Sequence, residues 1–167
     1  MRKYISMIMF AAWAVLGFSA CDTETDEKPG GTNVVKMAGF WDVSVDELKD
    51  DGSVNQNLGD VRLRSYNTVA NESDRMWLNM GAVEGGFSGL KLIVPINYAA
   101  KTFSCEATQS IYNKENSKKV TITDGKVLLG KGHNLHGLPT DSIVFTARFD
   151  DNKTYRIAGI RHSGFTE

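Results

Sequence analysis

The side chains best suited to metal binding are two histidines that lie close together in the sequence. His133 and His136 are three residues apart in KGHNLHG, a spacing that would place both imidazoles on one side of a helical turn. The flanking glycines indicate a loop instead. A catalytic zinc site usually has three protein ligands, and no spacing in this chain specifies the third. We therefore expect solvated loop histidines, no metal site and no cofactor.

Nucleophilic catalysis requires a hydroxyl or thiol, a base that activates it and donors for the oxyanion. The segment GGFSG at residues 85–89 comes closest to a nucleophile elbow, but the last glycine of the G-x-S-x-G pattern is displaced and no helix is expected to follow. His162 and Ser163 are adjacent at the end of a predicted strand, so their side chains should point to opposite faces. The sequence thus assigns no catalytic residue.

Paired carboxylates and tryptophans are the remaining residues with chemical potential, because a glycosidase needs two acids beneath a sugar. Asp50-Asp51 and Asp150-Asp151 occur in turn signals and are interpreted as turn formers. Trp41 and Trp77 lie in strand patterns, where packing in the core is the commoner role. Glycan binding is therefore kept only as a minor hypothesis.

The elements that would position these side chains are predicted to be short β-strands. From residue 33 on, period-2 alternation recurs between Gly, Asn and Asp clusters, and no helical period extends over 12 residues. Asp124-Gly125 should form a hairpin turn, and Pro95 indicates an edge strand or a bulge. We expect strands at 35–47, 61–69, 75–80, 88–97, 101–107, 118–123, 126–130, 141–149 and 153–162.

Eight or nine short strands with hairpin-like links indicate an all-β, antiparallel fold. The preferred architecture is an up-and-down β-barrel of about eight strands, and a β-sandwich is the alternative. Trp41, Val43 and Val45 should share the inner face of their strand. An eight-stranded barrel can hold one small ligand or be filled by side chains, and the pattern does not distinguish these cases.

The first 20 residues have the layout of a secretory signal peptide, with basic Arg2-Lys3, an apolar run and small residues at the end. Cys21 follows directly and resembles the lipidated cysteine of a bacterial lipoprotein lipobox. Residues 21–33 would form an acidic tether, and residues 34–167 a single domain. These features predict a lipid-anchored, surface-exposed lipoprotein of an outer membrane in the cell envelope.

The charge balance limits the partners that the domain could bind. After Arg2 and Lys3, 17 basic residues stand against 20 acidic ones. This balance argues against a nucleic-acid-binding surface, and two cysteines are too few for a disulfide scaffold. A composition with 41% hydrophobic residues is typical of a folded domain with a core.

Several blocks of the sequence, taken together, resemble one family of bacterial lipoproteins, called lipid-binding putative hydrolase. The resemblance implies a lipocalin-like β-barrel with a ligand cavity, and it carries over no catalytic residue. The blocks, in chain order, are AGFWDV (38–43), SYNT (65–68), MWL (76–78), NYAAKTFS (97–104), VTITDGKV (120–127), PTDSI (139–143) and GIRHSGF (159–165).

A lipid site requires an apolar lining and one or two polar groups for the head of the ligand. Arg62 and Arg64 share one strand face with Tyr66, where a guanidinium beside a tyrosine hydroxyl would hold a carboxylate. Exposed cross-strand ion pairing is the alternative role for these arginines. The predicted ligand-binding residues are Trp41, Tyr66, Met76, Leu92, Phe103, Phe145, Tyr155, Arg62 and Arg64.

Three functions follow from these observations. The leading hypothesis is a lipid-anchored protein that binds a small apolar or amphipathic, lipid-like ligand inside a β-barrel. The second is a non-enzymatic accessory protein of the envelope, with a filled core and a protein partner. A hydrolase is the third, and only the family name suggests it.

Overall fold

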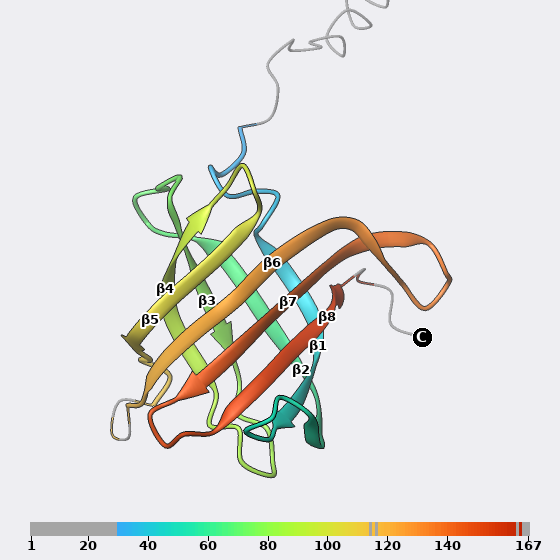
Figure 1. The fold of residues 1–167 in the computed structure, drawn as a ribbon. Coiled ribbons are helices and arrows are strands. Elements are labelled where there is room, and N and C mark those ends of the chain that lie inside the picture. The colour runs from blue at the N-terminus through green and yellow to red at the C-terminus, as the bar shows by residue number, and fades with distance from the viewer. Residues whose placement is uncertain (1–29, 114, 116, 163, 165–167) are drawn as a thin grey trace, which may run out of the picture. The chain divides into compact units, whose positions relative to one another are not determined.

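The computed structural model describes residues 30–113, 115, 117–162 and 164, and all regular secondary structure within them is β-strand. Eight antiparallel strands follow one another around a closed barrel, in chain order (Figure 1). The predicted up-and-down barrel is confirmed. The strands are β1 (Gly39–Leu48), β2 (Val54–Asn67), β3 (Arg75–Met80), β4 (Leu90–Asn97), β5 (Thr102–Gln109), β6 (Lys119–His133), β7 (Pro139–Phe149) and β8 (Thr154–Arg161).

The predicted N-terminal features lie outside the described residues. These are the signal peptide at 1–20, the lipidated Cys21 and most of the tether at 21–33. They stay predictions. Within the described part of the chain, no helix is long and apolar enough to cross a membrane.

Alternation along β1 shows how the sequence specifies the two sides of the barrel wall. Trp41, Val43 and Val45 are at most 1% exposed and point inward, as predicted. The residues between them point outward, where Asp42 pairs with Arg62 of β2 at 3.0 Å. A shift of one residue would bury these charges and expose the core, so the pattern fixes the register.

The strand β6 is the main departure from the predicted strands. Asp124-Gly125 was predicted to form a hairpin turn, but β6 continues through it with a register shift between Thr123 and Lys126. Asp124 has φ of 56°, and Gly125 lies against Phe103, where a side chain would clash. The hairpin prediction is wrong because turn residues also suit a β-bulge, which bends a strand around a barrel.

The first half of β2 was also missed by the strand prediction. Residues 54–60 are mostly exposed and read VNQNLGD, without an apolar face. They are strand because they pair with β1, from Val54 beside Leu48 to Asp60 beside Ser44. In this segment, pairing with β1 determines the strand conformation, which the alternation of apolar and polar residues does not indicate.

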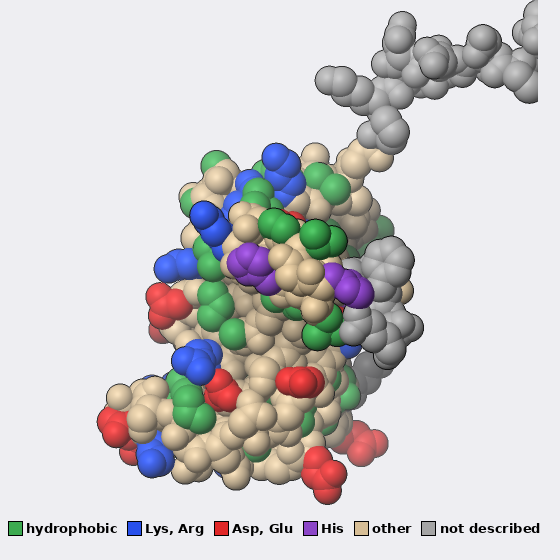
Figure 2. Space-filling view, turned by 90° about the vertical axis from the view of Figure 1, so that its right-hand side faces the viewer, with side chains coloured by type: hydrophobic (Ala, Val, Ile, Leu, Met, Phe, Trp, Pro, Cys, Tyr) green, Lys and Arg blue, Asp and Glu red, His purple; other side chains and the backbone are tan. Residues whose placement is uncertain are grey.

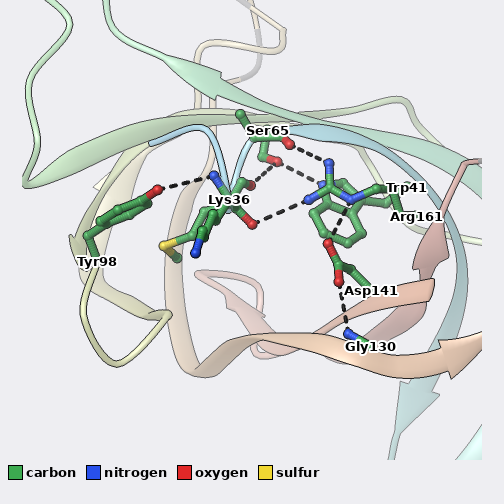
Figure 3. Close-up of polar contacts among 9 residues, drawn as sticks. Lys36, Trp41, Ser65, Tyr98, Gly130, Asp141 and Arg161 are labelled. Atoms are coloured by element: carbon green, nitrogen blue, oxygen red, sulfur yellow. Dashed lines mark hydrogen bonds and ion pairs between the residues drawn. The ribbon is translucent and has the colours of Figure 1, made fainter. Parts of the chain in front are cut away.

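One end of the barrel, here called the closed end, is sealed by the turn at 33–37. Val34 and Met37 from this turn are fully buried. Ser65 of β2 accepts a hydrogen bond from Trp41 Nε1 at 2.8 Å and donates one to the carbonyl oxygen of Met37 at 2.6 Å (Figure 3). Ser65 thereby ties the turn to two strands.

Arg161, near the end of β8, completes this seal. Its guanidinium carbon lies 4.5 Å from the centre of the Trp41 ring, and Nη1 donates to the Ala38 carbonyl oxygen at 2.7 Å. Nε donates to Asp141 of β7 at 3.0 Å, and Asp141 accepts a further bond from the Gly130 amide at 2.9 Å (Figure 3). The closed end is therefore held by buried polar bonds as well as apolar packing.

We expect Ser65→Ala to destabilise the barrel strongly. The substitution leaves the Trp41 indole N–H and the Met37 carbonyl without their partner at a site where Ser65 is only 2% exposed. Each unsatisfied buried group costs about 1–3 kcal/mol, so the free energy of unfolding should fall by about 2–4 kcal/mol. Urea unfolding measures this change. Ser104→Ala, on the exposed face of β5, is the control, and an equal loss in both variants would contradict the role of Ser65.

Candidate ligand site

The interior of the barrel gathers six of the predicted ligand-binding residues. They come from β1, β3, β4, β5, β7 and β8, and none is more than 3% exposed. Phe103 and Phe145 pack with ring centres 5.6 Å apart. The structure thus gives the barrel an apolar interior that a lipid chain would match in chemistry. The six residues are Trp41, Met76, Leu92, Phe103, Phe145 and Tyr155.

The interior is filled by side chains in this structure. Trp41, Leu63, Met76, Phe145 and Ile157 have no exposed surface. A space large enough for a water molecule beside them would leave part of that surface exposed. An apolar ligand can therefore enter only if side chains of the protein move out of its way.

One aromatic side chain closes the other end of the barrel. We call this end, opposite the closed end, the mouth. Phe87 is 1% exposed and comes from the loop at 81–89, between β3 and β4. Its ring packs edge-on against Tyr155 at 5.1 Å and against Phe149 at 5.6 Å. Phe87 thus acts as a plug, which packs against Phe149 of β7 and Tyr155 of β8.

The loop at 81–89 lies beside the part of β2 that has no pairing partner in β3. β3 pairs with β2 only from Leu63 to Asn67, so the longer β2 extends beyond it. Gly85 of the loop lies against the Leu58 side chain of that extension. The loop therefore closes both the mouth and the wall beside it.

Few side-chain hydrogen bonds hold the loop at 81–89 against the rest of the barrel, and within the loop the Val83 amide donates to the Phe87 carbonyl oxygen at 2.9 Å. Tyr155 Oη donates to the Gly86 carbonyl oxygen at 3.1 Å, and the Ala82 amide donates to Tyr112 Oη at 3.2 Å. Gly85 and Gly86 have φ of 99° and 134°, values that favour glycine. Because its loop contains glycines and makes few side-chain hydrogen bonds, Phe87 can be displaced at a lower cost in free energy than the turn that seals the closed end.

The sequence analysis missed Phe87 because it interpreted GGFSG as a turn entering a strand. One signal was available: an aromatic residue between glycines contributes little to a turn, and a large apolar side chain is stabilised by burial. Since Phe87 stands outside the alternating runs, its burial had to come from a loop that folds back on the barrel.

Charged residues surround the plug at the mouth. Lys118 Nζ lies 2.6 Å from Asp151 and 5.8 Å from the centre of the Phe149 ring. Lys153 Nζ lies 3.6 Å from Glu47. The rim of the mouth therefore offers ammonium groups that an anionic ligand head could reach while its chain is inside.

Burial of the Tyr155 phenol beside this rim changes its acidity. Desolvation, followed by the negative charges of Glu47 and Asp151, raises the pKa of Tyr155 from 10.0 to about 12. The phenol therefore keeps its proton, and with it the hydrogen bond to Gly86, through the physiological range.

The wall between β4 and β5 is the barrel's weakest seam. The register pairs here are Ile96 with Phe103 and Asn97 with Thr102. Pro95 was predicted to mark an edge strand or a bulge, but β4 lies between β3 and β5 in the closed barrel and pairs with β3 at Pro95 without a register shift. Its missing N–H suits its place just outside the β4–β5 pairs. A surface cleft of about 460 Å³ beside the seam is lined by residues of β4, β5 and β6.

Three of the predicted ligand-binding residues lie outside the barrel interior. Arg62 and Arg64 are exposed on the outer face of β2, and Tyr66 is half-buried on the same face. Arg62 pairs with Asp42, the cross-strand role considered as the alternative. Arg64 lies over the Phe40 ring, 5.6 Å from its centre. These residues cannot hold the head of a ligand in the barrel, because inward positions on β2 belong to Leu63 and Ser65.

Arg64 and Tyr66 do share an outer groove at the closed end. Its volume is about 620 Å³, and Val35, Phe40 and Asn79 also line it. Tyr66 stacks on Trp77, with ring centres 6.2 Å apart. The groove is separate from the mouth, so it does not supply polar groups to a ligand in the barrel.

His162 forms an acid–base pair that the sequence analysis did not foresee. Its Nδ1 lies 2.7 Å from Asp42 Oδ2, and Arg62 Nη2 lies 3.1 Å from the same nitrogen. Partial burial raises the pKa of Asp42, but hydrogen bonds from His162 and Arg62 outweigh it and hold the pKa below its usual range. Among the described residues, no hydroxyl or thiol bonds to His162, and the partners seen there, Asp42 and Arg62, are those of a surface ion pair.

The loop histidines were considered as metal ligands. His133 and His136 are exposed at the β6–β7 hairpin. Among the described residues, no three His, Cys, Asp or Glu side chains form a group that could hold a metal ion.

Comparison with known proteins finds one matching family and a solved structure of similar fold. The family described as "Lipid-binding putative hydrolase" matches residues 26–166. No curated protein matches the sequence. A solved structure described as a redesigned beta barrel is 13% identical and has a TM-score of 0.49, covering 79% of this chain and 96% of that one.

We expect the stability of the barrel to depend on Tyr155 above pH 10. Folding raises the pKa of Tyr155 to about 12, so its contribution is complete below pH 10 and is lost as the pH rises toward 12. The free energy of unfolding, measured in urea at several pH values, should fall more steeply over this range for the native sequence than for Tyr155→Phe. Equal slopes would contradict a buried, protonated phenol.

Proposed function

The chain belongs to the family described as "Lipid-binding putative hydrolase", and we propose that it holds the apolar part of a lipid inside its barrel. Family and fold both support a lipid-binding role. The observation that carries the proposal is the removable plug at the mouth: Phe87 fills apolar space and comes from a loop with few polar bonds.

In this proposal the ligand takes the place of Phe87. Withdrawal of the plug exposes the edges of Phe149 and Tyr155. Burial of the ligand's hydrocarbon offsets that exposure, because each square ångström of apolar surface removed from water contributes about 25 cal/mol. Binding is therefore an exchange of one apolar group for another.

The head of the ligand stays at the rim. Lys118 and Lys153 are paired with Asp151 and Glu47 there, and a carboxylate or phosphate head would compete for the same ammonium groups. The ligand class that fits both the interior and the rim is an amphipathic anion such as a fatty acid or a lysophospholipid.

The sequence supports a lipid anchor for this binding protein. Cys21 follows an apolar leader and small residues, the pattern that resembles a lipobox. We propose that the mature chain begins at a lipidated Cys21 and works in the cell envelope, at the surface of an outer membrane.

One observation favours the second candidate, an accessory protein with a protein partner. The interior is filled, as a barrel without a ligand would be. The two candidates differ in a single property, because only the lipid-binding protein accepts hydrocarbon in place of Phe87.

The test is binding of a fluorescent fatty acid by residues 22–167, which include every described strand, and by Phe87→Ala. Removal of the plug leaves apolar space that the ligand can fill without displacing a side chain. We expect affinity to rise by at least about tenfold, since the cost of opening is removed. Native mass spectrometry should show one bound molecule per chain.

Phe40→Ala is the matched control, since Phe40 is 51% exposed on the outer wall. Tyr155→Phe is a milder opening that keeps the ring and removes only the bond to Gly86, and we expect faster association without loss of the fold. Unchanged binding in both mouth variants, or no binding by any of the proteins, would refute the proposal and favour the accessory role.

A further inference from the structure

The hairpin between β6 and β7 presents leucines to solvent at its tip. Leu135 is 81% exposed and Leu138 is 60% exposed, and we call these two residues the leucine tip. Leu128 and Leu129, each 41% exposed, lie further back on β6. Figure 2 looks onto this side of the molecule and shows hydrophobic side chains gathered around histidines. Exposed leucines at a loop tip have no role in the core, which is packed elsewhere.

The chain segment that carries the leucine tip has charged side chains of one sign. From Gly125 to Thr140 the chain contains Lys126 and Lys131 and no Asp or Glu. The next acid, Asp141, is bonded to Arg161. An apolar tip preceded by two lysines on β6, of which Lys131 is the nearer, is complementary to a lipid surface with acidic head groups, which attracts basic residues close to it.

The leucine tip lies at the closed end of the barrel, where the chain arrives from its N-terminal segment. Arg161 joins this end together, since it bonds both to Asp141 of β7 and to the Lys36 carbonyl oxygen. Ten residues separate Cys21 from Thr32. Fully extended, they reach about 35 Å, so a lipid on Cys21 would keep this end of the barrel close to the membrane.

We propose that the leucine tip inserts into the surface of a bilayer that contains anionic lipids. The orientation argument rests on the lipid anchor of the proposed function, whereas the leucines and lysines stand independently of it. Leu135 and Leu138 enter the head-group boundary, and Lys131 lies among the head groups. The mouth and its plug then face away from that membrane, so the barrel receives its lipid from the aqueous side.

The experiment is a vesicle flotation assay of residues 22–167, which lack the anchoring cysteine. The vesicles are made of phosphatidylcholine, either alone or mixed with about 30% phosphatidylglycerol. The test variant is Leu135→Asp with Leu138→Asp. Its matched control is Val54→Asp with Ile111→Asp, which makes the same charge change at exposed positions of the mouth end. Thermal unfolding confirms that both variants fold.

We expect the native sequence to float with the anionic vesicles, and the leucine-tip variant to lose at least about tenfold in partitioning, because two apolar side chains are replaced by repelled charges. The control should stay within twofold of the native sequence. Equal loss in both variants, or no flotation of the native sequence, would overturn the proposal.

A different outcome would identify another occupant. If the native sequence does not float but forms a dimer in analytical ultracentrifugation, and the leucine-tip variant is monomeric, the tip binds a second copy and the membrane proposal is wrong. Fatty-acid binding is measured on the same proteins. Flotation without fatty-acid binding would refute the proposed function and leave this inference standing.

Discussion

Closure of an eight-stranded barrel is the constraint on which the rest of the structure depends. At this size the interior is just wide enough for side chains, so each inward residue must fit its neighbours, and Trp41, Met76 and Phe145 leave no exposed surface. Closure also gives every strand two paired neighbours, which leaves the two ends and the short β4–β5 seam as the places where the interior can meet solvent. The seals at the two ends therefore decide where a ligand could reach the interior.

The two ends are sealed by different means. At the closed end, Ser65 donates to the Met37 carbonyl oxygen of the turn at 33–37, and Arg161 donates to those of Lys36 and Ala38. Trp41 packs beneath them. Opening this end would leave several buried polar groups without partners, which is costly. At the mouth, Phe87 provides an apolar seal, and Tyr155 and Tyr112 each form one hydrogen bond with its loop. The difference in cost supports the two proposals, that a ligand enters at the mouth and that the closed end faces a membrane.

The sequence predicted the architecture because alternation is a local signal. It located the inward residues of β1 and the bounds of β3, and it identified the family. It failed where tertiary contacts decide the outcome. Asp124-Gly125 has turn chemistry but forms a bulge against Phe103, and residues 54–60 become strand only through pairing with β1.

Six of the nine predicted ligand-binding residues lie inside the barrel, and three lie on its outer face. The six inward residues follow from strand alternation, whereas Arg62, Arg64 and Tyr66 share a face that closure turns outward. Phe87 lies in a loop, and nothing in its neighbours indicates that it reaches Phe149 and Tyr155.

The central claim is that lipid binding displaces the Phe87 side chain, and fluorine NMR of the protein labelled at Phe87 tests it directly. Titration with oleate should move the Phe87 resonance from a buried to a solvent-exposed shift in proportion to occupancy. Oleate that binds while the Phe87 resonance stays unchanged would contradict the account.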